Sequence, residues 1–89
     1  MKIKLELFGA SRDFSTKDHL EIEVQDKASI NDLRNEVIKH VDKNFSGNEN
    51  FIKVVKSSAF CSENNEIISD NYKITKDQKI GIIPPIGGG

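Results

Sequence analysis

Apolar and polar side chains alternate in two stretches near the start of the chain, residues 2–8 and 20–25. Lysine, glutamate or glutamine separates the apolar positions, which are Ile3, Leu5, Leu7, Leu20, Ile22 and Val24. A period of two is typical of a β-strand that buries one face. Gly9 ends the first stretch, and a mostly polar segment leads to the second. We therefore expect two strands that pair as a hairpin.

The apolar spacing changes to three or four at residue 30. Four apolar residues then fall on one helical stripe: Ile30, Leu33, Val37 and Val41. Ser29 directly precedes this stripe, and Asp32 follows Ser29 at the spacing of a capping box, where an acidic side chain also suits the helix dipole. The polar segment 44–50, which contains Gly47, is typical of a helix end. The pattern predicts a helix over residues 30–41.

The second half of the chain carries shorter apolar runs. Residues 51–55 could form a helical turn or a strand, because periodicity does not separate the two over so short a run, and we favour a short helix. Residues 59–61 and 67–68 flank the turn-forming segment Glu63-Asn64-Asn65, which predicts a short antiparallel hairpin. Residues 79–83 predict a final strand.

The order of these elements predicts an α+β fold. A helix that follows a hairpin must cross to one face of the sheet and cover it, so the later strands add to the same sheet. If the first and last strands are parallel neighbours at the centre, the arrangement is the β-grasp of ubiquitin-like proteins. We therefore expect a mixed sheet of about four or five strands with one main helix packed on one face.

Composition narrows the possible functions. The 89 residues allow one domain with a modest core, which suits a carrier or binding module better than an enzyme with a deep pocket. A net charge of -1 gives no electrostatic footprint for nucleic acid. A single cysteine, the absence of a signal-peptide pattern and the lack of a long apolar stretch lead us to expect a cytoplasmic protein with no membrane attachment.

The chain ends in a run of narrow and apolar residues, Pro84-Pro85-Ile86-Gly87-Gly88-Gly89, and Lys79 is the last polar side chain before it. The two prolines favour an extended backbone, so this segment should project from the fold. Fully extended, it would reach about 20 Å. We expect a β-grasp domain over residues 1–83 and a flexible tail over residues 84–89, shaped to enter a narrow channel in another protein.

This tail resembles the Pro-Pro-Val-x-Gly-Gly end of the small subunit of molybdopterin synthase, a sulfur carrier of the MoaD/ThiS ubiquitin-like family. The resemblance extends over most of the chain and includes the first strand and its loop (residues 8–13), the start of the helix (28–33) and the hairpin (59–68). The chain departs from the family at Asp77-Gln78-Lys79-Ile80, where a turn glycine and a second acidic residue are usual. Gly87 stands where serine, threonine or alanine is more common.

The resemblance implies a function for the terminal glycine. In this family an E1-like activating enzyme consumes ATP to adenylate the terminal carboxylate, and a sulfur donor system converts it to a thiocarboxylate. The tail then enters the large subunit of molybdopterin synthase, where its sulfur passes to precursor Z in molybdenum cofactor biosynthesis. By this resemblance Gly89 is the reactive terminus, and the tail-threading residues are Pro84, Pro85, Ile86, Gly87 and Gly88. The chain itself would bind no cofactor and would not be the catalyst.

A second group of candidate residues concerns contacts with a partner. The final strand carries apolar side chains on both faces, and one face must enter the core. The other could be covered within the fold or could dock on a partner. The candidate partner-interface residues are Phe8, Arg12, Ile80, Ile82 and Ile83, with Arg12 included by analogy to the family.

Other functions and sites remain open or are disfavoured. The same thiocarboxylate could serve thiazole synthesis or tRNA thiolation, or Gly89 could form an isopeptide bond to target lysines as a ubiquitin-like modifier. Cys61 lies in an apolar run and is expected to be buried and inert. His19 and His40 have no cysteine at ligand spacing, so we expect no metal site. Glu21 and Glu23 are expected on a solvated strand face.

Overall fold

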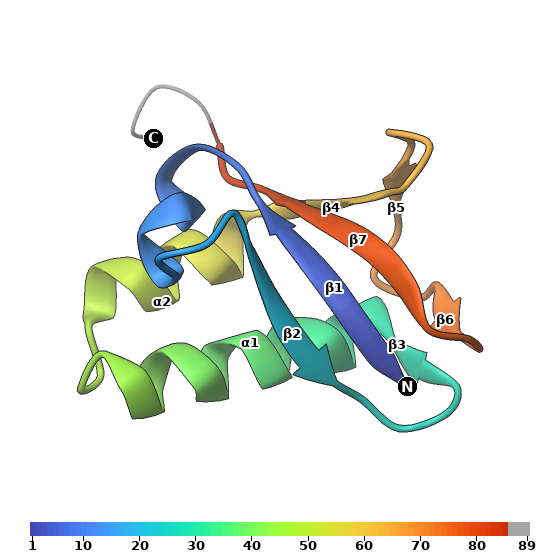
Figure 1. Ribbon diagram of the computed structural model, residues 1–89, viewed down its shortest axis with the longest axis horizontal. Helices are drawn as coiled ribbons and strands as arrows, with labels where there is room; N and C mark the ends of the chain where they lie inside the picture. The colour runs from blue at the N-terminus through green and yellow to red at the C-terminus, as the bar shows by residue number, and fades with distance from the viewer. Residues whose placement is uncertain (86–89) are drawn as a thin grey trace.

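The computed structural model describes residues 1–85 (Figure 1). Its elements, in chain order, are β1 (Lys2–Leu7), the 3-10 helix η1 (Gly9–Phe14), β2 (His19–Glu23), β3 (Ala28–Ser29), α1 (Ile30–Asn44), α2 (Glu49–Ser57), β4 (Ala59–Ser62), β5 (Ile67–Ile68), β6 (Lys73–Ile74) and β7 (Gln78–Ile83). The predicted helix, the short second helix and the predicted strands are all present.

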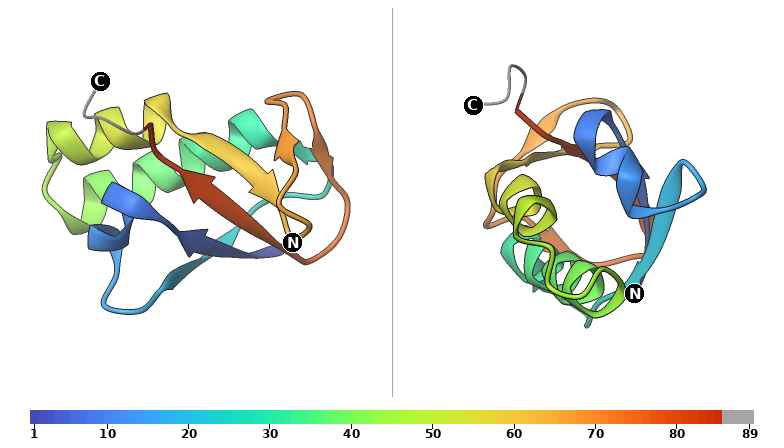
Figure 2. Two further views of the ribbon diagram at one scale, coloured as in Figure 1. Left: turned by 90° about the horizontal axis from the view of Figure 1, so that it is seen from above. Right: turned by 90° about the vertical axis from the view of Figure 1, so that its left-hand side faces the viewer.

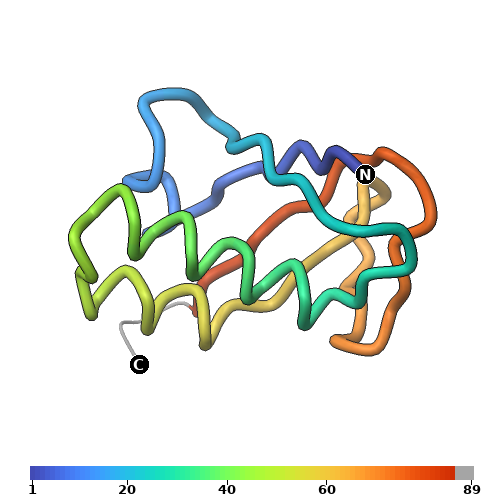
Figure 3. The backbone as a smooth tube through the Cα atoms, turned by 90° about the horizontal axis from the view of Figure 1, so that it is seen from below, coloured from blue at the N-terminus to red at the C-terminus, as the bar shows by residue number. Residues whose placement is uncertain are grey.

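The main sheet has five strands in the order β2-β1-β7-β4-β5. β1 and β7 pair in parallel at its centre, while β1 with β2, β4 with β7 and β4 with β5 pair antiparallel. Helices α1 and α2 lie across one face of this sheet (Figures 2 and 3). This arrangement confirms the predicted mixed sheet and the β-grasp fold.

The core lies between the sheet and the two helices. The residues with alternating or helical apolar spacing in the first half of the chain supply most of it, and the second half adds Val55, Phe60, Ile74, Ile80 and Ile82. At the start of α1 the Ser29 amide donates to the Asp32 carboxylate at 2.9 Å, and the Asp32 amide donates to the Ser29 hydroxyl at 3.1 Å. Hydrogen bonds from the Ser29 backbone and then its side chain lower the pKa of Asp32.

Three elements, η1, β3 and β6, have no counterpart in the predicted order. The polar segment after β1 folds into η1, where the Ser11 hydroxyl bonds both the amide and the carbonyl of Phe8. Phe14 at its end is buried and packs on Phe51 of α2, with ring centroids 5.2 Å apart. β3 and β6 form a separate two-stranded sheet. These short pieces depend on contacts between distant segments, so local periodicity carries no signal for them.

Arg34 of α1 joins three segments that are distant in sequence. Its guanidinium donates to the carbonyls of Val55 at 2.8 Å and Ser58 at 2.6 Å, where α2 ends, and to the Asp70 carboxylate at 2.9 Å. It also lies over the Phe60 ring, 4.8 Å from the centroid. The Arg34 side chain is only 12% exposed, and its bonds to the carbonyls of Val55 and Ser58 are partly buried.

Replacing Arg34 by methionine should lower the free energy of unfolding by about 2–4 kcal/mol, because the carbonyls at the end of α2 lose a charged donor while partly buried. Asp70 is 57% exposed, so Asp70→Asn should cost under about 1 kcal/mol. Urea denaturation of both variants measures the difference. Equal losses would mean that the ion pair, and not the carbonyl bonds, stabilises this corner.

Candidate functional site

The final strand β7 separates its apolar side chains between two faces of the sheet. Ile80 and Ile82 are fully buried beneath the helices, opposite Leu5 and Leu7 of β1. Their side chains form the face that enters the core and are not accessible to a partner, so the prediction that Ile80 and Ile82 are interface residues is wrong. The physical reason is that β7 is central and its helix-facing side must fill the core.

The other face of β7 is the open face of the sheet, and Gly81 lies at its middle. A Cβ added at Gly81 would lie 2.7 Å from the Cys61 Sγ and 2.9 Å from the Phe8 Cε2. Real side chains do not tolerate such distances, so the missing side chain is what lets the Phe8 ring and the Cys61 thiol pack together over β7. Cys61 is 4% exposed, as expected for an inert thiol.

Around this point the open face carries an apolar patch that consists of Phe8, Ala59, Ile67 and Ile83. Phe8 is 42% exposed and Ile67 is 66% exposed, while Ala59 and Ile83 are half-buried. Strand register brings them together, since Ala59 pairs with Ile83, and Ile67 pairs with Cys61 beside Gly81. The interface residues predicted from the sequence included Phe8 and Ile83 but not Ala59 and Ile67. The last two reach the patch through the register of β4 and β5, and no local sequence pattern predicts that register.

The tail begins beside this patch. Because β1 and β7 are parallel neighbours, they end at the same edge, with Gly9 just after β1 and Pro84 just after β7. Gly9 has φ of 55°, a conformation that glycine adopts at no steric cost, and a Cβ added there would lie 3.9 Å from the Pro84 ring. Pro84 is buried and Pro85 is exposed. The predicted roles of Ile86, Gly87, Gly88 and Gly89 lie outside the described residues.

Charges surround the patch without a dominant sign. Arg12 is exposed in η1, the segment that follows Phe8. On the open face Lys79 forms an ion pair with Glu6 at 3.2 Å, and Lys4 and Lys2 lie opposite Glu21 and Glu23 in the strand register. A patch of apolar side chains with a balanced charged border is typical of a protein interface and unlike a catalytic cluster.

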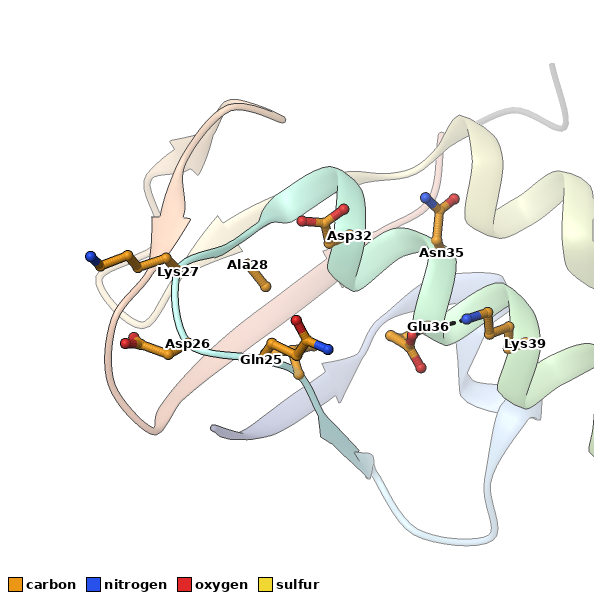
Figure 4. A pocket seen from close by; sticks show the side chains of 9 residues that line it. Gln25, Asp26, Lys27, Ala28, Asp32, Asn35, Glu36 and Lys39 are labelled. Atoms are coloured by element: carbon orange, nitrogen blue, oxygen red, sulfur yellow. Dashed lines mark hydrogen bonds and ion pairs between the residues drawn. The ribbon is translucent and has the colours of Figure 1, made fainter.

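Two hollows in the described surface lie away from the apolar patch and from Pro84. One of about 370 Å³ lies between residues 24–28 and α1, with mostly polar or charged side chains around it (Figure 4). Another of about 470 Å³ lies on the open face near Lys4 and Gln78. Phe8, Ile83 and Pro84 line neither of them. Among residues 1–85, no group of three or more histidine, cysteine or acidic side chains is placed to hold a metal ion.

Neither helix in the described part of the chain has the length and apolar character needed to cross a membrane.

Three solved structures resemble this chain in fold. The first, from Pyrococcus furiosus, is described as molybdopterin converting factor, subunit 1, and has a TM-score of 0.69 at 23% identity over 96% of this chain and 98% of that one. SAMP1 from Haloferax volcanii has a TM-score of 0.68 at 13% identity over 100% of both chains. Caldiarchaeum subterraneum ubiquitin has a TM-score of 0.62 at 18% identity over 100% of this chain and 98% of that one.

These similarities establish the fold and not the function, because all three identities are low. A search of curated proteins gives no match. A family model, described as ThiS family, matches residues 5–89 and therefore nearly the whole chain. It covers the central β1–β7 pair, the apolar patch and the glycine tail together. The chain belongs to the ThiS family of ubiquitin-like sulfur carriers.

Proposed function

We propose that this chain is the sulfur-carrying small subunit of a molybdopterin synthase. Gly89 is adenylated by an E1-like activating enzyme, and a sulfur donor then displaces AMP to leave a thiocarboxylate. The chain delivers this sulfur to precursor Z inside the large subunit. ATP is consumed by the activating enzyme, and the carrier itself binds no cofactor and contributes no catalytic side chain. A single free cysteine, Cys61, is consistent with a protein that acts in the reducing cytoplasm.

The observation that carries this proposal is the position of Pro84. It is buried beside Gly9 at the end of the central strand β7, directly before a second proline and the glycine run. The base of the tail is thus held by the fold, while the last three residues of the chain are glycines without side chains. A fixed base reduces the entropy lost when a tail enters a channel, and glycines leave the terminal carboxylate open to attack.

The apolar patch supports a role for the sheet in docking. It adjoins the base of the tail on the open face, so a partner that covers Phe8 and Ile83 would have its channel next to Pro84. We propose that the large subunit and the activating enzyme use this face in turn. Arg12, exposed on the segment after Phe8, is proposed as a polar contact at the edge of the same surface.

The proposal is tested by intact mass spectrometry of the purified chain after incubation with an E1-like activating enzyme, ATP and a sulfur source. The mass should rise by the difference between one sulfur and one oxygen atom. Mixing the product with a large subunit and precursor Z should then yield molybdopterin.

The same samples distinguish the proposed function from a protein modifier and from a sulfur carrier of another pathway. High-mass lysine conjugates without the mass increase would show a protein modifier and defeat the carrier proposal. A thiocarboxylate that supports thiazole synthesis or tRNA thiolation, but no molybdopterin, would keep the carrier chemistry and change the pathway. A reaction without ATP serves as the control.

A further inference from the structure

Strand β2 forms one edge of the five-stranded sheet, and within residues 1–85 no strand pairs with its outer side. The N-terminal ammonium of Met1 donates to the Val24 carbonyl, the Val24 amide donates to the Met1 carbonyl, and the Leu7 amide donates to the Asp18 carbonyl. Bonded pairs alternate in an antiparallel ladder, so residues 18, 20, 22 and 24 point their backbone groups toward β1. The amides and carbonyls of His19, Glu21 and Glu23 therefore point away from the sheet.

Helix α1 provides a wall along this free edge. A hollow of about 300 Å³ lies between β2 and the helix, and its lining residues on the helix are Glu36, Lys39, His40 and Lys43. These four follow each other at helical spacing, so they form one stripe parallel to the strand. Figure 3 shows α1 passing beside residues 19–23, and Figure 4 shows Glu36 and Lys39 on this part of the helix.

The stripe has a net positive charge. Glu36 and Lys39 form an ion pair at 3.3 Å and so largely cancel each other. Within residues 1–85 Lys43 has no ion-pair partner, and His40 adds a second positive charge when it is protonated. On the other side of the edge, Glu21 and Glu23 are already opposite Lys4 and Lys2 of β1. The helix wall therefore sets the sign of the charge that an added strand would meet.

We propose that the β2 edge binds an extended acidic peptide segment of a partner protein. The segment adds a sixth strand to the sheet. It exchanges backbone hydrogen bonds with His19, Glu21 and Glu23, and its helix-facing side chains are aspartate or glutamate, placed against Lys43 and His40. Strand addition of this kind draws its affinity from main-chain bonds and its specificity from alternate side chains.

This surface is separate from the apolar patch. β1 lies between β2 and β7, so a peptide on the edge leaves Phe8, Ile83 and Pro84 uncovered. The inference does not rest on the chemistry of Gly89, and the full chain can be tested without activation.

The probe is a short peptide of alternating valine and aspartate, blocked at both ends, titrated into the isotopically labelled chain to about 1 mM. Nuclear magnetic resonance should show saturable shifts of the amides of His19, Glu21 and Glu23 and of residues 39–43. A matched peptide with asparagine in place of aspartate should bind about fivefold more weakly, and added salt should reduce the difference between the two.

Two variants test the edge and the wall separately. Lys43→Glu should weaken binding of the aspartate peptide about fivefold or more and leave the asparagine peptide unaffected. Glu21→Pro removes an outward amide without breaking the ladder to β1, because proline is tolerated on edge strands, and it should weaken both peptides. Glu21→Gln, which keeps the amide, should retain binding. If the proline variant does not fold, the shifts in the unaltered chain and the Lys43→Glu result still test whether the peptide binds at the β2 edge.

Three results would overturn the proposal. The first is the absence of saturable shifts on β2 with either peptide. The second is shifts centred on Phe8 and Ile83, which would place the peptide on the apolar patch. The third is a concentration-dependent shift of the β2 amides without peptide, which would mean that a second copy of this chain occupies the edge.

Discussion

Replacing Ile82 by alanine should lower the free energy of unfolding by about 2–5 kcal/mol, which is a large part of the roughly 5–15 kcal/mol that holds a domain together. Ile82 is 0% exposed and pairs with Leu7 on one side and Phe60 on the other, both of which are core residues. A central strand between two filled neighbours has little freedom to collapse into the space left behind. Urea denaturation followed by circular dichroism measures the loss.

The matched control is the next residue. Ile83 has the same side chain but lies half-buried on the open face, so Ile83→Ala should cost less than about 1 kcal/mol. It should instead weaken binding to the proposed partner, a molybdopterin synthase large subunit, since it removes part of the apolar patch. Similar stability losses at both positions would contradict the assignment of these two isoleucines to opposite faces.

This pair of residues illustrates how far the sequence alone could lead. The run from Lys79 to Ile83 showed that a strand was present and that both its faces were apolar. It did not show which isoleucines face the helices, because that depends on the register with β1 and β4. Alternation in β1 determined its own inner face, and the parallel pairing Leu5 with Ile80 carries that assignment to β7. The fold class was predictable because each main element has its own period.

The candidate site was harder to predict from the sequence for the same reason, since it also depends on strand register. Phe8 and the tail could be identified as candidates from the sequence itself. Ala59 and Ile67 belong to the patch only because strand pairing brings them there. The bonds of Arg34 span 21 to 36 positions along the chain, which no local pattern records. Likewise, the free edge of β2 is a property of sheet order and not of the residues in that strand.

The two proposed interaction surfaces lie on different parts of one small sheet. The apolar patch and the base of the tail lie where the central strands β1 and β7 end, and the β2 edge lies beside α1. A carrier that must meet an activating enzyme and then an acceptor benefits from this separation, because a contact at the edge need not be broken when the tail changes partner. The tail remains the part on which the proposed chemistry depends.

Deleting Gly89 should abolish sulfur loading completely while leaving the thermal transition unchanged. The reacting carboxylate would then lie one residue closer to the fold, and because Pro84 is packed beside Gly9, the base of the tail cannot advance to compensate. The described core runs from Ile3 to Ile82, so the shortened chain should keep its stability. Intact mass after activation reports loading, and circular dichroism on heating reports the fold.

The control for this deletion keeps the length of the tail. Gly87→Ser introduces a side chain that is common at this position in related tails, so the variant should still be loaded. Loss of loading in both variants would mean that the tail is sensitive to any change and not to the position of its terminus. Full loading of the shortened chain would contradict this prediction. It would mean that the reaction does not require the terminal carboxylate to lie at residue 89, and that the distance from Pro84 to the terminus does not limit loading.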